Sequence, residues 1–280
     1  MNDSLRLLIQ KITKLPTIPL IAHQILNLSS DEKTSLGKLE SIIQQDPAIA
    51  AKVISFSNSA LFGHISSCTT ITCAIRKIGF DNVLNIALGI SLMTLFDSGN
   101  QERAFDYQKL YRHSLAVGML SKRLAEGLGL KRTEEYFLSG MLHDLGFLLL
   151  NRHFPGMYRK SIDERTKGEC PLEAERKVLG FTHAEAGAWL ADKWNLPVAL
   201  WEAILQHHTP SRAKKHTRLA AVVHLADYLT TRKFYAPDEK SREYPLDPSS
   251  LEALALSREG IEEMAEELDT SIFSGGVFLS

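Results

Sequence analysis

Apolar residues return at a helical period along most of this chain, and no segment shows the sustained alternation of a half-buried strand. The first two faces of this kind consist of Ile18, Ile21, Ile25 and Leu28, and of Leu36, Leu39 and Ile43. Ser35 stands where its side chain can cap the start of the second helix. The pattern predicts helices throughout, and therefore an all-α protein.

Start and stop signals divide the rest of the first part. Asp46-Pro47 predicts a helix start, because Asp46 can accept free amide hydrogens and Pro47 fits the first turn. A helix through residues 50–54 should follow. Gly63 and the polar stretch behind it interrupt the pattern, and a further helix is expected from Asp81 to Phe96.

Gly99 and Asn100, followed by charged residues, are the strongest boundary signal in the chain. The segment from Phe137 to Leu150 is apolar nearly all round, which predicts one central, buried helix. The other helices predicted after the boundary are Leu110–Leu128 (ended by Gly129), Ala184–Trp194, Val198–His208 and Thr217–Leu229.

The last part combines two kinds of segment. Residues 232–250 hold three prolines among charges and are predicted to form a surface loop, and Leu251–Leu268 is predicted to be an amphipathic, acidic helix. We therefore expect a multi-helix bundle in which residues 1–98 form an N-terminal helical subdomain. This subdomain should pack on a C-terminal helical subdomain, residues 105–231, with the loop and helix of residues 232–280 closing the chain.

Composition excludes few functions. The chain has 280 residues, of which 44% are hydrophobic and 23% charged, as in an ordinary globular protein. A formal net charge of −1 gives no electrostatic sign of binding to nucleic acid or to an anionic membrane. No run approaches the roughly 20 apolar residues of a membrane span.

The cysteines are odd in number and scattered, at Cys68, Cys73 and Cys170. They do not suggest a disulfide framework, and a reducing cytoplasm is the expected location. Cys68 and Cys73 are read as small core or loop residues rather than as a metal-binding pair.

Histidine and aspartate residues occupy positions predicted to face the core. Asp144 lies inside the most apolar helix, directly after His143, and Asp227 lies in another apolar run. A buried carboxylate needs a cation, a charged partner or several hydrogen bonds. The inward set comprises His113, His143, Asp144, His207, His208 and Asp227. His183 precedes a helix, and its face is not fixed by periodicity.

This set favours a metal site. Imidazole nitrogen and carboxylate oxygen suit divalent transition ions such as Fe, Mn or Zn, and helix bundles build metal sites from inward ligands of several helices. Any single core histidine is more often hydrogen-bonded to backbone, and we read His224 as a packed core histidine, with a role as partner of Asp227 the alternative. An ion-free histidine pocket that responds to pH or binds a ligand is a further possibility.

The order of these residues, with His first, then His-Asp, then further histidines and a final Asp, resembles the HD superfamily of metal-dependent phosphohydrolases. One branch is more similar: the HDOD domain, a signalling relative of the HD-GYP phosphodiesterases. Segments carrying that resemblance are Leu15–Pro19, Asp46-Pro47 with the helix after it, Asn58–Gly63, Ala74-Ile75, Ile78–Phe80, Gly140–Gly146 and Trp194–Pro197. The resemblance implies an HD-like helical fold for residues 105–231.

The resemblance also implies a ligand set for one or two ions. His113, His143, Asp144 and Asp227 match the ligands of one metal, and His183, His207 and His208 match the extra histidines that support a second metal in HD-GYP enzymes.

Three departures argue against the reaction of those enzymes. Phe147 stands where HD-GYP enzymes have Lys, which removes a cation able to hold a phosphate oxygen. Thr209-Pro210 follows the double histidine in place of Gly-Tyr-Pro, and Lys109 stands where a third metal would need Glu.

Two functions compete on these grounds. The leading hypothesis is a non-catalytic signal-transduction protein with a regulatory or scaffold role and a retained metal site, binding a signalling protein or a small nucleotide-like ligand. The alternative is a metal-dependent phosphohydrolase or phosphodiesterase acting on a nucleotide or cyclic dinucleotide.

Overall fold

The computed structural model describes residues 17–29, 36–59, 62, 67–94, 106–166, 168–234 and 244–267. Within those residues every regular element is helical and none is a strand, so the predicted all-α class is confirmed. Ser35, Gly63 and the boundary at Gly99-Asn100 lie outside the described residues. None of the described helices combines the length and apolar character needed to cross a bilayer.

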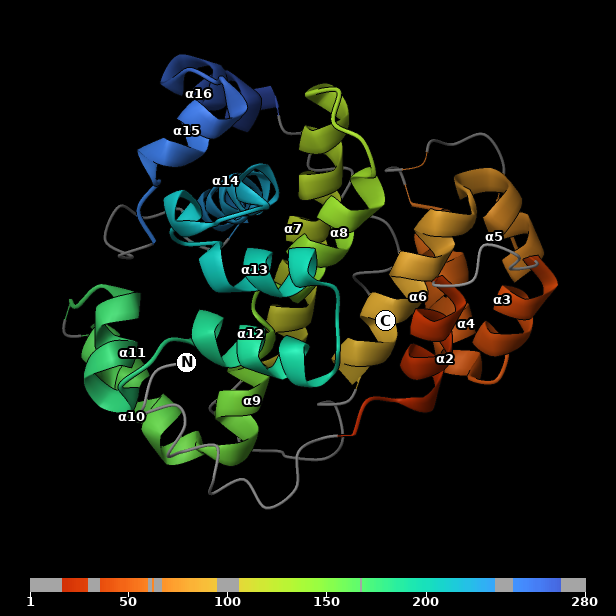
Figure 1. Cartoon of the computed structure of the whole chain (residues 1–280), viewed down its shortest axis with the longest axis horizontal. Coiled ribbons are helices and arrows are strands. Elements are labelled where there is room, and N and C mark those ends of the chain that lie inside the picture. Colours follow the sequence, from red (N-terminus) through yellow and green to blue (C-terminus); the bar gives the residue numbers. More distant parts are fainter. Residues whose placement is uncertain are drawn as a thin grey trace. The chain divides into compact units, whose positions relative to one another are not determined.

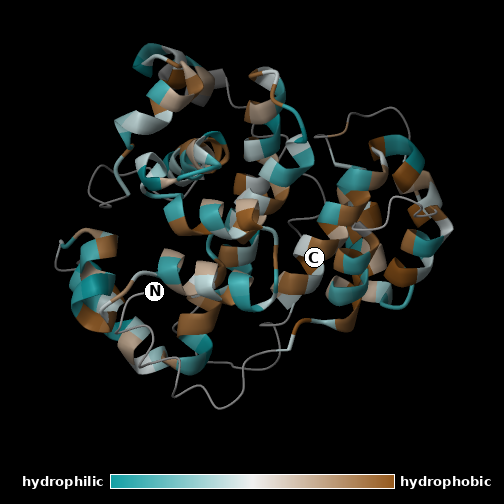
Figure 2. Cartoon of the chain, viewed as in Figure 1, coloured by the Kyte–Doolittle hydropathy of each residue, from teal (hydrophilic) through white to brown (hydrophobic). Residues whose placement is uncertain are grey.

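The chain divides into two compact units, one within residues 16–98 and the other mainly within residues 99–267. The finer division predicted from the sequence, with a separate part at 232–280, stays a prediction. Most helices contain both apolar and polar residues (Figure 2).

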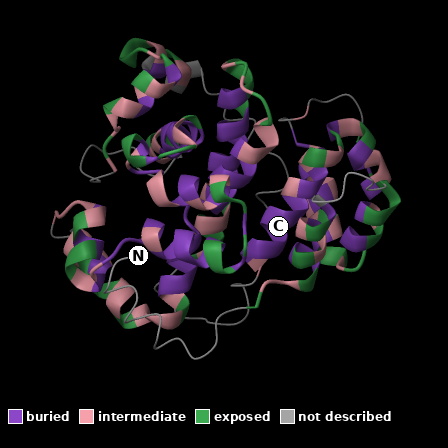
Figure 3. Ribbon diagram, in the orientation of Figure 1, coloured by how far each residue is buried: buried purple, intermediate pink, exposed green. Residues whose placement is uncertain are grey.

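The first unit consists of α2 (Leu20–Ser29), α3 (Leu36–Ile43), α4 (Pro47–Ser57), α5 (Ile71–Ile78) and α6 (Phe80–Thr94) (Figure 1). Helix α6 is its centre, because nearly every residue from Val83 to Met93 is buried and the other helices contact it (Figure 3). The Asp46 carboxylate caps α4 as predicted, accepting hydrogen bonds from the Ala48 and Ile49 amides at 2.8 and 3.1 Å. Leu36, predicted to face the core, is instead 53% exposed.

The segment before α5 confirms one prediction and contradicts another. The polar stretch before Ile71 does not only interrupt the pattern, since Thr70 caps α5 by accepting a hydrogen bond from the Cys73 amide at 3.1 Å. Cys68 and Cys73 form a disulfide, with their Cα atoms 5.4 Å apart. The Asn58 side chain holds Cys68 in place by bonding both its amide and its carbonyl group, at 2.7 and 2.8 Å.

The second unit begins with the helix pair α7 (Tyr107–Gly127) and α8 (Thr133–Leu142). Glycine makes their contact close, because a Cβ on Gly140 would lie 2.9 Å from the Gly118 Cα. The elements that follow are α9 (Leu145–His153), α10 (Pro155–Thr166), α11 (Pro171–Leu179), α12 (His183–Lys193), α13 (Val198–Gln206), the 3₁₀ turn η2 (Pro210–Arg212), α14 (Thr217–Phe234), α15 (Pro248–Leu254) and α16 (Arg258–Glu267). Helix α14 contacts α7 and α8, and α12 contacts α9 and α13.

Two long predicted helices are broken in the structure. The expected helix from Phe137 to Leu150 ends at Leu142 and restarts at Leu145, so His143 and Asp144 stand at the junction of α8 and α9. The expected helix from Leu251 to Leu268 is interrupted at Ala255, which has a left-handed φ of 54°, and Ser257 then bonds the Gly260 amide at the start of α16. Helices α10 and α11 had no predicted counterpart, although each begins with a proline at its first position.

Candidate metal centre

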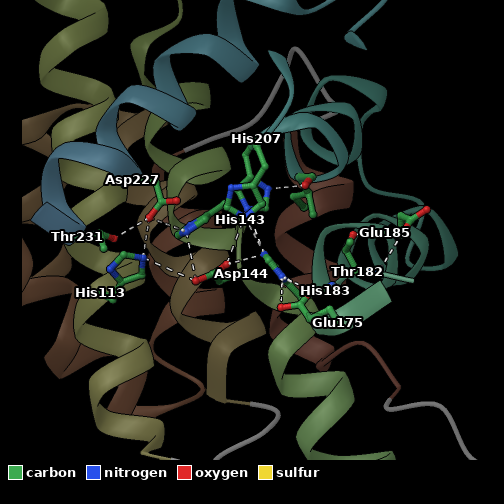
Figure 4. A network of polar contacts seen from close by, with 12 residues as sticks. His113, His143, Asp144, Glu175, Thr182, His183, Glu185, His207, Asp227 and Thr231 are labelled. Carbon is green, nitrogen blue, oxygen red and sulfur yellow. Dashed lines mark hydrogen bonds and ion pairs between the residues drawn. The ribbon is translucent and has the colours of Figure 1, made fainter. Parts of the chain in front are cut away.

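All predicted metal ligands meet inside the second unit, and Figure 4 labels each of them except His208. His113 comes from α7, His143 and Asp144 from the α8–α9 junction, His183 from the first residue of α12, His207 and His208 from the end of α13, and Asp227 from α14. His143, His183 and His207 are completely buried. The broken helix matters here, because the junction directs two consecutive side chains into one cluster.

One half of the cluster, the aspartate group, consists of His113, His143, Asp144 and Asp227. His113 Nε2 lies 3.1 Å from Asp227 Oδ1 and 3.7 Å from Asp144 Oδ2. His143 Nε2 lies 3.3 Å from Asp144 Oδ2 and 3.7 Å from Asp227 Oδ1. Two imidazole nitrogens and two carboxylate oxygens therefore converge on one small space.

The other half, the histidine trio, consists of His183, His207 and His208. His183 Nε2 lies 3.3 Å from His207 Nε2 and 3.1 Å from His208 Nε2. Asp144 belongs to both halves: its Oδ2 faces the aspartate group, and its Oδ1 lies 3.3 Å from His183 Nε2. One carboxylate therefore stands between two sets of nitrogen ligands.

The second ring nitrogen of the buried histidines fixes their orientation. His143 Nδ1 bonds the Gly140 carbonyl and His207 Nδ1 bonds the Ile204 carbonyl, each at 2.7 Å. Because a carbonyl oxygen only accepts, each Nδ1 carries the proton that it donates. In its neutral form each ring would therefore direct the lone pair of Nε2 into the cluster, the orientation that a metal ligand needs.

His183 is oriented by a carboxylate, which sequence reasoning missed. Glu175 of α11 is 1% exposed, and its oxygens lie 2.8 and 2.9 Å from His183 Nδ1. One of these oxygens also accepts the His183 backbone amide at 2.8 Å. Carboxylate–histidine pairs of this kind are common behind metal ligands, where they fix the ring and raise its basicity.

The charges of the cluster are strongly coupled. Burial alone would lower the pKa of His143, but Asp144 and Asp227 raise it well above its usual value. Burial also opposes ionisation of Asp144, yet His143 and His183 hold the pKa of this carboxyl well below its usual range. For His183, burial is outweighed by Glu175 and Asp144, which raise its pKa to about 9.

The remaining histidines of the trio behave in the opposite way. Burial, reinforced by repulsion from His143 and His183, lowers the pKa of His207 to about 3. Burial and the neighbouring His207 likewise lower the pKa of His208 well below its usual value. Without an ion, these shifts favour the protonated forms of His143 and His183 and the neutral forms of His207 and His208.

Aromatic rings cover the trio on the side of α9 and α15. Phe147 stacks on His183 with ring centroids 4.0 Å apart and planes 16° apart. Tyr244, which stands before α15, stacks on His208 at 3.8 Å and 25°. Tyr244 was missed by sequence reasoning because it lies in a segment read only as a polar loop.

His224 links two backbone segments by hydrogen bonds. Its Nδ1 donates to the His207 carbonyl at 2.7 Å, and its Nε2 accepts the Asp247 amide at 2.8 Å. It is 1% exposed, as expected for a packed core histidine, and the hydrogen bond to Asp227 is made by Thr231 instead, at 3.2 Å. His224 thus holds the backbone of a predicted ligand rather than the carboxylate considered as its alternative partner.

A backbone contact between α9 and α12 sets the position of His183. A Cβ added to Gly146 would lie 1.8 Å from the His183 carbonyl oxygen, and one added to Gly187 would lie 2.9 Å from the Gly146 amide nitrogen. Position 146 must therefore be glycine for the two backbones to approach this closely.

Comparison with known proteins identifies an HDOD domain by sequence and a similar fold by structure. The HDOD domain model matches residues 15–210. A solved HDOD domain protein of unknown function from Geobacter sulfurreducens has a TM-score of 0.80 and 24% identity, covering 98% of this chain and 96% of that one. This likeness shows the fold.

Curated relatives match over a smaller share of their own length. A protein of Treponema pallidum named only as uncharacterized is 24% identical over 220 residues, 78% of this chain and 42% of that protein. Ribonuclease Y of Thermus thermophilus is 30% identical over 155 residues, 55% of this chain and 22% of the enzyme. The chain therefore spans less than half the length of these relatives.

Proposed function

We propose a function for this chain from its membership of the HDOD domain family. The chain belongs to this family, because the family model matches residues 15–210. It is a regulatory protein of signal transduction that holds divalent metal in its cluster and does not hydrolyse a substrate there. The metal stiffens the bundle, which presents its surface to a signalling protein or a small nucleotide-like ligand.

The convergence of ring nitrogens carries the metal proposal. His183 and His207 each donate through Nδ1, so in their neutral forms the two Nε2 atoms, 3.3 Å apart, direct lone pairs at each other. Such an arrangement is repulsive unless positive charge lies between the rings, as protons or as a metal ion. A transition-metal ion satisfies all of these nitrogens at once, whereas a proton is shared by only two.

The residues present fit two ions. The aspartate group would hold one and the histidine trio the other, with Asp144 offering one oxygen to each. A bound divalent ion would polarise an oxygen ligand and lower the pKa of a bound water. The chain itself supplies orientation, through the Gly140 and Ile204 carbonyls and Glu175, and it excludes bulk water by burial.

Phe147 supports a non-catalytic role. Its ring covers His183, and it provides no charge at the position where the related HD-GYP phosphodiesterases have lysine. Phosphoryl transfer depends on cations that stabilise the charge developing on phosphate oxygens. An apolar ring at this position provides none.

Elemental analysis tests the metal. Protein purified without chelator after growth in rich medium should carry one or two transition-metal ions per chain. Loading of metal-free protein at neutral pH should release protons, because the ions displace those on His143 and His183. A folded protein that neither carries nor takes up metal would overturn this part of the proposal.

A second function, metal-dependent phosphohydrolysis, is favoured by the complete set of ligands. The test substrates are an aryl phosphodiester, cyclic di-GMP and, because of the partial match to ribonuclease Y, a short RNA, each with added Mn²⁺ or Fe²⁺. We expect no turnover above the Asp144→Ala variant. Turnover that Asp144→Ala abolishes would establish the enzyme and refute the non-catalytic role.

A further inference from the structure

Tyr244 lies outside the residues that match the HDOD domain model, which end at position 210, yet it contacts the centre of the cluster. Its ring stacks on His208 and lies 5.8 Å from the His183 ring at a tilted angle. Tyr244 is not part of a helix; it stands in the short segment Tyr244–Asp247 before α15. A residue from the C-terminal part thus covers two members of the histidine trio.

The segment is fastened to the ligands it covers. The Asp247 amide donates to His224 Nε2, and His224 Nδ1 donates to the His207 carbonyl. The Asp247 carboxylate also caps α15, accepting the Ser249 amide at 2.9 Å. Through His224, the position of this segment and the position of the His207-His208 backbone are therefore linked.

The two aromatic covers of the trio differ in how they are held. Phe147 is buried and belongs to the regular helix α9, whereas Tyr244 stands in a non-helical segment. The hydroxyl oxygen of Tyr244 is buried but has no hydrogen-bond partner among the described residues. An unpaired buried hydroxyl favours movement toward solvent, and this movement is opposed by the stacking on His208, the bond from Asp247 to His224 and the cap of α15.

We propose that the segment Tyr244–Asp247 is a displaceable cover that controls access to the histidine trio. With the cover docked, His208 is shielded from solvent-borne ions and ligands. With the cover displaced, His208 and the face of the trio that it shields become open to a phosphate-class anion or to exchange of metal. The role of the trio as a metal site rests on the proposed function, but the shielding of His208 does not.

Carbethoxylation by diethyl pyrocarbonate, located by mass spectrometry, measures the exposure of His208 in the full chain treated with chelator. The Tyr244→Ala variant should raise the rate of modification of His208 about tenfold, since it removes the ring that stacks on His208. Tyr244→Phe, which keeps the ring, should stay within about twofold of the unchanged chain. Tyr107→Ala, at the start of α7, is the control for loss of a tyrosine elsewhere.

A second pair of variants tests the tether while leaving Tyr244 in place. Asp247 has a φ of −77°, which proline can adopt, so Asp247→Pro removes the amide that His224 accepts. Asp247→Ala keeps that amide and loses only the cap of α15. Modification of His208 should therefore rise in Asp247→Pro well above its level in Asp247→Ala.

Equal modification of His208 in the unchanged chain and in Tyr244→Ala would overturn the cover, as would equal opening by Tyr244→Ala and Tyr244→Phe. The same conclusion follows if the two Asp247 variants behave alike. In protein that carries metal, Tyr244→Ala should also lose it to a chelator faster. If no metal is found, the proposed function fails while the labelling result still decides on the cover.

Discussion

Gly146 offers a sharp test of how the fold positions the second half of the cluster. Its φ is not in the left-handed region, so alanine there introduces no backbone strain, and any effect comes from packing. The added Cβ would stand 1.8 Å from the His183 carbonyl oxygen, 2.7 Å from the His183 carbonyl carbon and 2.9 Å from the Gly187 amide nitrogen. All three are backbone atoms, so no side-chain rotation relieves the clash.

The size of the effect follows from these distances. Ordinary van der Waals contact begins near 3.4 Å, so α9 and the start of α12 must separate by about 1.6 Å. Overpacking of this kind costs about 1 to 3 kcal/mol, which lowers Tm by about 3 to 10 °C in a unit of this size. Metal ligands tolerate displacements of only about 0.2 Å, so His183 should no longer complete the trio.

The assay combines thermal unfolding with metal stoichiometry. Gly146→Ala should remain folded, unfold at lower temperature and retain only the ion of the aspartate group. Gly156→Ala is the matched control, because a Cβ at this position in α10 meets nothing within 4 Å. A Gly146→Ala protein with unchanged Tm and two bound ions would refute the reasoning.

Further predictions concern pH and Glu175. Metal-free protein should be most stable near pH 6.5. Stability should fall from pH 6.5 to 9, because native His183, with a pKa of about 9, keeps a proton that the unfolded chain has lost. It should also fall below pH 6.5, because the unfolded chain gains a proton that native His207, with a pKa of about 3, does not bind. Unfolding by denaturant across pH 5 to 9 checks the two slopes, and stability that does not fall between 6.5 and 9 would contradict the coupling. Glu175→Gln should weaken binding of the second ion about 10- to 100-fold in a metal titration. Glu169→Gln makes the same chemical change at a half-buried carboxylate that pairs with Lys177 and should not weaken it. Equal affinities in both variants would remove Glu175 from the site.

The members of the cluster could be predicted from sequence because an isolated buried charge is incompatible with apolar surroundings. Asp144 and Asp227 stand in apolar runs, and a buried carboxylate requires a partner. Apolar surroundings indicate the members of the cluster but not its division, which depends on Asp144 directing one oxygen to each half. The break that makes this possible was hidden, because the segment is apolar on both sides of His143 and reads as one helix.

The supporting residues could not be predicted for different reasons. Glu175 lies in a short helix rich in charged residues, where a glutamate is normally solvated, and only the fold brings it to His183. Tyr244 is far from His208 along the chain, and the prolines and charges around it indicated only a loop. The disulfide at Cys68 was missed because the short spacing to Cys73 says nothing of the Asn58 side chain that holds the loop.

The central claim is that this cluster is a metal centre. Anomalous X-ray diffraction from crystals of protein loaded with Mn²⁺, Fe²⁺ or Zn²⁺ tests it most directly, because it locates each ion as well as detecting it. We expect two peaks, one within the aspartate group and one within the histidine trio, with Asp144 between them. A well-ordered cluster with no anomalous peak at either position, in protein exposed to saturating metal, would contradict this claim.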